Sequence, residues 1–267
     1  MVRSRSENRG RSRSRRALWQ ALGFILANSY FFKFLKYIPC PTLNCYACPA
    51  ANFACPIGTL QHFAVIRRVP FFTLGILGAV GSTFGRGSCG WICPVGGLQD
   101  MLYRLPVPVK KIYLSNRLGA RLSFLRYVVL AVLVFIIPFL TLEPWFSKLC
   151  FVGTLEAGIP LALGNQQIRA LIGPFFWLKI GITAALLGLM LFMKRPFCRF
   201  ICPLGAIYSP FNKVAPGFAI TIRPDLCTDC GECTRACPMD LDVPREVNGL
   251  NCIRCRECVG LCKALSP

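Results

Sequence analysis

The sequence predicts an all-α membrane domain of four transmembrane helices with an internal pseudo-two-fold repeat, followed by a small α+β domain. Three observations support this prediction. The chain has 267 residues, of which 54% are hydrophobic, whereas about 45–50% is usual in soluble domains. Seven of its eleven acidic residues follow Ile222, so the polar part lies at the C-terminal end. Between these two parts, one seven-residue motif occurs four times.

The N-terminus is strongly basic. The first sixteen residues contain seven arginines, and we expect residues 1–16 to form a disordered cytoplasmic tail. The net charge of +20 would also suit a protein that binds nucleic acid. However, the basic residues cluster on alternate loops between apolar segments, which is typical of the cytoplasmic loops of membrane proteins. We therefore expect a lipid bilayer, and no nucleic acid, among the partners.

Four apolar stretches predict the spanning helices of a membrane domain at 17–222. They lie at residues 17–38, 69–85, 127–142 and 170–193. Basic residues between Arg86 and Arg126 and after Met193 place that loop and both termini in the cytoplasm. The segments 39–68 and 143–169 then lie outside. The predicted location is the inner, cytoplasmic membrane, which the chain crosses several times.

The repeated motif reads Cys, Pro or Phe, an apolar residue, Gly, any residue, an apolar residue and a seventh residue; we name it the Cys-Gly motif. Its copies are "CPIGTLQ" at Cys55, "CPVGGLQ" at Cys93, "CFVGTLE" at Cys150 and "CPLGAIY" at Cys202. The first and third copies fall on the outer side of the predicted membrane, and the other two fall on the cytoplasmic side. This alternation predicts a pseudo-two-fold symmetry between the two halves of the membrane domain. Proline suits the first position of a helix, so we expect each cysteine near a helix N-cap, where the dipole favours a thiolate. The glycine would let a bulky neighbour approach.

The C-terminal domain, at 223–267, contains a very specific signal. Two runs of C-x2-C-x2-C-x3-C are typical of bacterial ferredoxins with two [4Fe–4S] clusters, in which the fourth cysteine of each run ligates the other cluster. The first predicted ligand set is therefore Cys227, Cys230, Cys233 and Cys262, and the second is Cys252, Cys255, Cys258 and Cys237. Structural zinc is the alternative that we do not favour.

The cytoplasmic side of the predicted membrane domain carries two C-x3-C-P pairs, which we name the inner group: Cys89, Cys93, Cys198 and Cys202. Cysteines four apart lie on one face of a helix. Two such pairs brought together would make a four-thiolate site for a further iron–sulfur cluster or another soft metal. Buried thiols or redox dithiols are the alternative.

The opposite side carries five cysteines, which we name the outer group: Cys40, Cys45, Cys48, Cys55 and Cys150. Four thiolates complete a cluster, so one is surplus. By symmetry with the inner group, we favour the set without Cys40. The rival set omits Cys150 and comes from one loop. A disulfide is the third alternative, because an outer face is compatible with oxidation.

Two further residues are candidates for contact with a second cofactor. His62 is the only histidine, so this chain alone cannot form a bis-histidine haem site. His62 is a candidate quinone contact or haem ligand, against the simpler interpretation as an interface residue. Lys179 lies within the fourth apolar stretch. It is a candidate functional charge beside a cluster or quinone, against the alternative that it extends to the membrane surface.

The segments "GRGSCGWICPVGGLQD" and "RPFCRFICPLGA" and the double ferredoxin run resemble the membrane polyferredoxins of the NapH, NosR and CcoG type. This resemblance covers most of the chain from about Ala17. It implies a four-span core, cytoplasmic [4Fe–4S] clusters and electron transfer that is often linked to quinol and a periplasmic acceptor. The cysteine-rich outer loop and Phe151, in place of proline, depart from the family pattern.

These observations predict a membrane-bound electron-transfer subunit rather than an enzyme with its own catalytic side chains. Electrons would pass between a cytoplasmic redox protein and an outer redox subunit, for which a cytochrome is a candidate. One alternative is a quinol dehydrogenase with clusters on one side only. Another is an assembly factor that reduces copper with its C-x3-C-P thiols.

Overall fold

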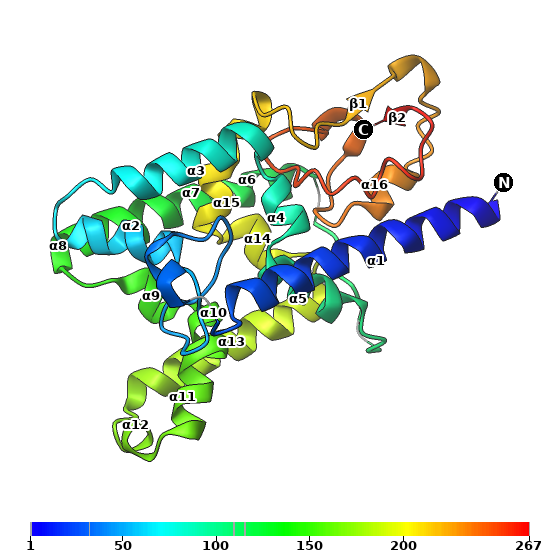
Figure 1. Ribbon diagram of the computed structural model, residues 1–267. Helices are drawn as coiled ribbons and strands as arrows, with labels where there is room; N and C mark the ends of the chain where they lie inside the picture. Colours follow the sequence, from blue (N-terminus) through cyan, green and yellow to red (C-terminus); the bar gives the residue numbers. More distant parts are fainter. Residues whose placement is uncertain (1, 32, 109, 115, 267) are drawn as a thin grey trace.

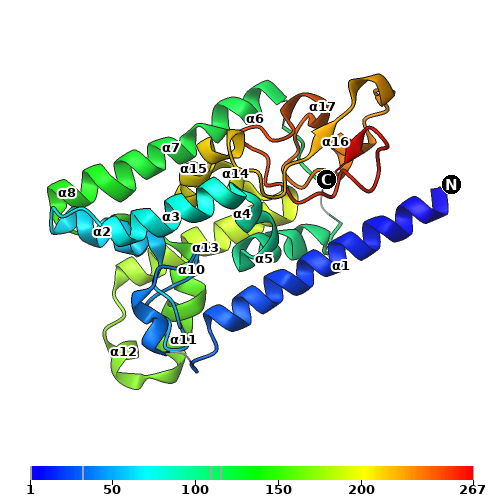
Figure 2. The same ribbon diagram turned by 45° about the horizontal axis from the view of Figure 1, so that its top comes forward.

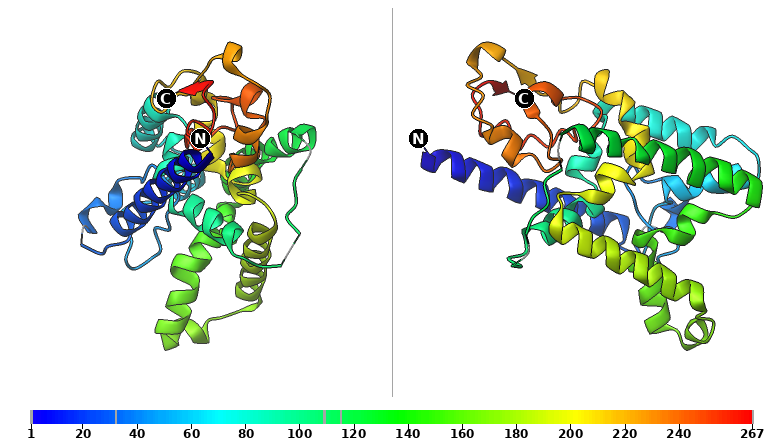
Figure 3. Two further views of the ribbon diagram at one scale, coloured as in Figure 1. Left: turned by 90° about the vertical axis from the view of Figure 1, so that its right-hand side faces the viewer. Right: turned by 180° about the vertical axis from the view of Figure 1, so that it is seen from behind.

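The computed structural model describes residues 2–31, 33–108, 110–114 and 116–266. The chain is mainly helical, and its helices run between two ends of an elongated molecule (Figure 1). The C-terminal domain lies at one end, and the turns beside α2 and α8 lie at the other (Figure 3). Eight cysteines lie in the C-terminal domain itself, and the helices α4, α5, α10, α14 and α15, at which other cysteines lie, are between the two ends (Figure 1).

The first helix, α1 (Val2–Ala27), differs from the expectation in two respects. The basic segment expected to be a disordered tail is helical from residue 2, and the apolar segment expected to reach residue 38 stops at Ala27. The tail is docked because buried Arg16 pairs with Asp100 and with Glu257, the latter at 2.8 Å. A helix that is already nucleated extends at little cost, so these contacts favour helix over coil.

Side-chain amides explain why α1 ends at Ala27. The Nδ2 atoms of Asn28, Asn52 and Asn44 donate to the carbonyl oxygens of Phe24, Leu26 and Ala27, at 3.3, 2.8 and 3.5 Å. These are among the last carbonyls of the helix, and those of Phe24 and Ala27 also accept from the backbone N–H groups of Asn28 and Asn52, at 3.0 and 2.8 Å. Side chains and backbone beyond the helix thus satisfy its end as a cap would. A loop with the short 3-10 helix η1 (Lys33–Tyr37) follows.

The first half of the helical region continues with four helices: α2 (Pro56–Val65), α3 (Phe71–Phe84), α4 (Gly87–Trp91) and α5 (Pro94–Arg104). A single apolar helix then runs from Leu118 to Thr141. It comprises α6 (Asn116–Ser123), α7 (Leu125–Val129), the π-helical turn η2 (Leu130–Ile136) and α8 (Ile137–Thr141).

The second half repeats this order. Its helices are α9 (Trp145–Leu149), α10 (Phe151–Gly153), the π-helical turn η3 (Thr154–Gly158), α11 (Ile159–Gly164), α12 (Gln166–Ala170), α13 (Pro174–Phe192), α14 (Pro196–Phe200) and α15 (Pro203–Tyr208). α11 and α12 project from the bundle, and α13 returns to it (Figures 1 and 2). Each half therefore contains an outer motif, an apolar helix and an inner motif.

The C-terminal domain is small and has little regular structure. β1 (Thr221–Ile222) pairs antiparallel with β2 (Leu265–Ser266), so the two ends of the domain meet. Between them lie the 3-10 helix η5 (Pro224–Leu226), α16 (Glu232–Ala236) and α17 (Val243–Glu246), and the 3-10 helix η4 (Pro210–Lys213) leads into the domain.

Two helices in the described part of the chain are long and apolar enough to cross a membrane, Leu118–Thr141 and Pro174–Phe192. Phe71–Phe84 and Phe151–Gly164 are apolar but shorter. The second, third and fourth predicted stretches are thus helical, with somewhat different bounds, whereas α1 includes only the first part of the stretch at 17–38.

Candidate metal centres

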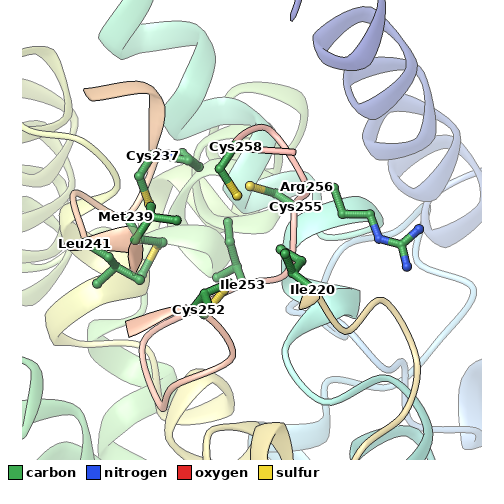
Figure 4. Close-up of a pocket in the computed structure, with 12 residues that line it drawn as sticks. Ile220, Cys237, Met239, Leu241, Cys252, Ile253, Cys255, Arg256 and Cys258 are labelled. Carbon is green, nitrogen blue, oxygen red and sulfur yellow. The ribbon is translucent and has the colours of Figure 1, made fainter. Parts of the chain in front are cut away.

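The second ferredoxin set surrounds an apolar cavity. Cys237, Cys252, Cys255 and Cys258 line it together with Ile220, Met239, Leu241 and Ile253, and Figure 4 shows these side chains around it. Burial raises the pKa of Cys237 to about 11 and that of Cys255 to about 12. Cys237 comes from the other cysteine run, so the structure brings together the four residues that the spacing predicts.

The first ferredoxin set is nearer the surface. Burial raises the pKa of Cys233, and the neighbouring Cys262 raises it further, so the fourth cysteine of the second run lies beside the first run. Cys230 is exposed, and Cys227 is half-buried. A cluster held here would lie closer to solvent than one held by the second set.

Helix starts position the cysteines of the Cys-Gly motif. Cys55, Cys93, Cys150 and Cys202 are the N-cap residues of α2, α5, α10 and α15, with φ between −72° and −63°. The Sγ atoms of Cys55 and Cys202 accept hydrogen bonds from Gly58 and Gly205 N–H, each at 3.4 Å. The predicted N-cap position is confirmed, and it directs backbone N–H groups at the thiols.

The inner group is buried and draws on both halves of the helical region. Burial raises the pKa of Cys93 and of Cys198 to about 11, and each thiol is close enough to another inner cysteine to be raised further. All four thiols are buried. The structure therefore brings together Cys89, Cys93, Cys198 and Cys202 as one group.

Two equivalent arginines hold the halves together at the inner group. Arg86 Nη2 donates to the Cys198 carbonyl at 3.1 Å, and Arg195 Nη1 donates to the Cys89 carbonyl at 3.4 Å. A methyl group on Gly96 would lie 3.0 Å from Arg195 Nη1, and one on Gly205 would lie 3.1 Å from Arg86 Nη2. The motif glycine is thus needed because a guanidinium from the opposite half lies against it.

The seventh residue of each Cys-Gly motif contacts another part of the chain near a cysteine group. Gln99 accepts from Phe197 N–H at 3.1 Å, and Gln61 accepts from Ser147 N–H at 3.1 Å. Glu156 accepts from Cys45 N–H at 2.7 Å, and Tyr208 donates to the Pro41 carbonyl at 3.1 Å. Sequence reasoning did not identify Gln61, Gln99 and Tyr208, although the two glutamines at equivalent motif positions were an available signal.

The outer group separates into four cysteines and one. Burial is the main cause that raises the pKa of Cys55 to about 12, and the charges of Cys150 and Cys45 also raise it. The charge of Cys48 in turn raises the pKa of Cys45, which burial also raises. Cys40 instead lies 3.2 Å from Thr42 Oγ1 and is not among the charges that act on the other outer thiols. The set without Cys40 and the rival set without Cys150 both stay predictions.

The two candidate contact residues differ in position. His62 is exposed on α2, where its ring and that of Phe63 pack edge to face with centroids 6.0 Å apart. Lys179 is half-buried on α13, and its charge lowers the pKa of Cys150, which burial raises to about 11. Lys179 is therefore a charge beside the outer group.

The inner and outer groups are neighbours. Leu43, from the outer loop, directs its backbone N–H to the thiol of Cys93. Burial raises the pKa of Cys93, and this N–H lowers it. Tyr208 is fully buried and bonds Pro41 in that loop, while the charges of Cys40, Cys89, Cys93 and Cys202 all act on it. The outer loop thus reaches into the molecule as far as the inner group.

The inner group also lies against the C-terminal domain. Asn212 accepts from Arg86 N–H at 2.8 Å and donates to the Cys252 carbonyl at 2.6 Å. Trp91 Nε1 donates to the Arg254 carbonyl at 3.2 Å. A methyl group on Gly90 would lie 3.6 Å from the Cα of Cys255. Backbone segments that carry ligand cysteines are therefore in direct contact.

Among the described residues, no group of three or more His, Cys, Asp or Glu side chains is placed to hold a single metal ion. A cubane is a larger object, because eight core atoms lie between its four thiolates. The cysteine sets fit such a cluster in chemistry, since each supplies four thiols and buried guanidinium atoms beside the inner group have no hydrogen-bond partner.

Comparison with known proteins matches the same segments. A model of a 4Fe-4S binding domain matches twice, at residues 68–114 and 174–220, and a model of a 4Fe-4S dicluster domain matches 219–263. Each copy of the first match contains an apolar helix and the inner pair that follows it. The sequence repeat inferred from the motifs therefore also appears in the family match.

An uncharacterized protein of Methanocaldococcus jannaschii is 32% identical over 186 residues, which are 67% of this chain and 69% of that protein. The regulatory protein NosR of Pseudomonas aeruginosa is 27% identical over 66% of this chain and 23% of its own length. The ferredoxin-type protein NapH of Escherichia coli is 22% identical over 65% of this chain and 58% of its own length. No solved structure matches the chain.

Proposed function

Because the chain belongs to the NapH/NosR-type family of polyferredoxins, whose [4Fe–4S] domains it contains, we propose that it conducts electrons across a membrane through four clusters. The order would be outer group, inner group, second ferredoxin set and first ferredoxin set. The membrane domain would occupy residues 17–222 and the cytoplasmic ferredoxin domain residues 223–267. Redox partner proteins would exchange electrons with the two ends.

One observation supports this proposal above all others: residues of the outer loop contact the inner group, and residues beside the inner group contact the second ferredoxin set. Leu43 joins the outer loop to Cys93 of the inner group. Asn212 and Gly90 join the inner group to the segment of Cys252 and Cys255. The exposed Cys230 ends the proposed order at the surface. No step needs to cross the full bilayer core of about 30 Å.

Placement in a membrane is supported by the exposure of the apolar helices. Only 17% and 11% of the most apolar stretches in Leu118–Thr141 and Pro174–Phe192 are buried. A core helix of a soluble protein would be mostly covered, whereas lipid can cover these surfaces. The shorter helix Phe71–Phe84 exposes Phe71 and Phe72 in the same way. A reporter after Met193 should read cytoplasmic, and one near Thr42 should read the opposite side.

The test of the proposal is the iron content of the purified chain. Four cubanes require about sixteen irons per chain, and the ferredoxin domain alone requires about eight. Cys93→Ser and Cys55→Ser should each remove about four irons and stop electron transfer in proteoliposomes between a cytoplasmic donor and an outer acceptor. About eight irons in undamaged wild-type protein would contradict the transmembrane route.

A quinone site is the second candidate, and one cavity favours it. A mainly apolar cavity of about 870 Å³ lies between α1, α5 and the segment 151–160, within the usual range for small-molecule sites. Cys48 and Glu156 line it together with Phe24, Leu98 and Leu155. A lipid-soluble quinone could therefore lie beside the outer group, with a carboxylate near its head group.

Leu155→Trp should separate these two functions. The bulky side chain would narrow the cavity beside Glu156 and leave every cysteine in place, so reduction of the clusters by a quinol should be weakened strongly while reduction by dithionite and the iron content stay unchanged. Leu163→Trp, at an exposed position of α11 outside the cavity lining, is the matched control. Unchanged quinol-dependent reduction in Leu155→Trp would exclude the cavity as the quinone site.

A further inference from the structure

We propose that Arg86 and Arg126 are the counter-charges of the inner cluster. This inference rests on the proposed function, in which the inner group holds a cluster. The positive charges of these arginines would make the inner group easier to reduce than the outer group. The two arginines would thereby favour movement of an electron from the outer group to the inner group.

Arg86 and Arg126 are both fully buried, at 0% and 1% exposure. They come from different helical segments, yet both donate to the Leu250 carbonyl oxygen, at 3.1 and 3.2 Å. Arg86 also bonds the Cys198 carbonyl, and Arg126 is close enough to Cys202 to interact electrostatically. Two guanidinium groups therefore converge beside the inner group on a single neutral acceptor.

Neither guanidinium has an anionic partner within the described part of the chain. Among the described residues, Arg126 donates to the Leu250 carbonyl and to the Tyr127 hydroxyl, the latter at 3.5 Å, and its guanidinium lies 5.1 Å from the centroid of the neutral Tyr127 ring. Its Nε and Nη1 atoms, and the Nε of Arg86, are buried without a hydrogen-bond partner among the described residues. A buried charge that is not compensated is costly, so this arrangement requires an anion nearby.

Other buried arginines in the same region do have carboxylate partners. Arg195 makes two bonds to Asp100, each at 2.7 Å, and Arg199 lies 3.5 Å from Asp240. Asp100 is shared with Arg16, and Asp240 is shared with Lys194. Positive charge therefore exceeds negative charge around the inner group, and Arg86 and Arg126 add to this excess without a carboxylate of their own. The outer group has one charge of each sign beside it, Glu156 and Lys179.

The inner thiolates with their cluster supply the missing anion. An oxidised cubane with four thiolates is a dianion, and it becomes a trianion when it accepts one electron from a redox partner. That step forms and breaks no bond in the protein. Nearby positive charge stabilises the trianion more than the dianion, so it raises the reduction potential of the cluster. The two arginines match the dianion in charge and favour its reduction.

Arg126 is the better residue to change, because Arg86 also holds the two halves together. We expect Arg126→Gln to shift the EPR redox titration of the inner cluster to lower potential and Arg126→Lys to leave it near the wild-type value. Arg121→Gln removes an exposed charge from the same helix and is the matched control. The inner signal is assigned by its loss in Cys93→Ser, and the outer signal by its loss in Cys55→Ser.

Loss of about four irons in Arg126→Gln, with full iron in Arg126→Lys, would also support a counter-charge. Identical potentials and iron contents in the glutamine and lysine variants would overturn the inference, since shape alone would then explain the site. The inference would also be overturned if, in the wild-type protein, the reduction potential of the inner cluster were lower than that of the outer cluster. Absence of the inner signal from wild-type protein would instead contradict the proposed function on which the inference rests.

Discussion

Gln99 Nε2 lies 2.9 Å from the Sγ of Cys198, and Gln99 Oε1 accepts from the neighbouring Phe197 N–H. One fully buried amide from the first half of the membrane domain thus orients a proposed ligand in the second half. The same side chain both positions the sulfur and donates to it. Such hydrogen bonds raise the reduction potential of iron–sulfur clusters.

Gln99→Leu should therefore lower the potential of the inner cluster and destabilise the fold. The Phe197 N–H would remain buried without a partner, which costs about 1–3 kcal/mol. EPR redox titration and thermal unfolding in detergent measure the two effects. Gln61→Leu is the control, because Gln61 makes the equivalent contact to Ser147; it should destabilise similarly and leave the inner potential unchanged.

Gly205→Ala should destabilise the chain by about 1–3 kcal/mol, because the added methyl group would lie 3.1 Å from the buried Arg86 guanidinium. Gly96→Ala should have a similar effect through Arg195. In Gly188→Ala the methyl group meets nothing within 4 Å on a helix, so stability should be unchanged or slightly higher. Equal unfolding temperatures for Gly205→Ala and Gly188→Ala would show that the guanidinium contact is not needed.

The features that local sequence predicted are those with a short-range physical cause. Proline after Cys93 and Cys202 predisposes a helix start, and the structure has an N-cap at each of them. The spacing of the ferredoxin runs predicted the group that includes Cys237. The apolar stretch at 170–193 gave the helix Pro174–Phe192.

The features that sequence reasoning missed depend on distant partners. α1 stops at Ala27 because Asn44 and Asn52, far along the chain, bond its last carbonyls. The basic segment is helical rather than disordered because Arg16 meets Asp100 and Glu257. No local pattern encodes such contacts, so only the tertiary structure reveals them.

The surplus cysteine of the outer group can be identified by substitution. Cys40→Ser should retain the full iron content, because Cys40 lies against Thr42 and apart from the other outer thiols. Cys45→Ser should lose about four irons, since Cys45 is among the residues whose charge acts on both Cys55 and Cys150. Iron and acid-labile sulfide analysis of the two variants is decisive. Loss of iron in Cys40→Ser but not in a Cys150→Ser variant would favour the rival set from one loop.

Tyr208 is the side chain through which we expect electrons to pass between the outer and inner groups. It is fully buried, its hydroxyl bonds Pro41 beside Cys40, and the inner cysteines Cys89, Cys93 and Cys202 surround it closely enough to act on its pKa. Tyr208→Phe removes only the hydrogen bond, which costs about 0.5–1.5 kcal/mol, and should slow transfer slightly. Tyr208→Leu removes the ring and should slow it strongly.

Transfer is measured as the rate at which the inner cluster is reduced after flash reduction of the outer side in proteoliposomes. Both variants should keep the iron content and both cluster potentials, so a change in rate reports the pathway and not the driving force. Cluster loss in Tyr208→Leu is a separate result, and Tyr208→Met, which fills the space with a flexible apolar chain, then replaces it. If transfer in the leucine and methionine variants equals that in wild type, the electron bypasses Tyr208, and the contact of Leu43 with Cys93 becomes the route to test next.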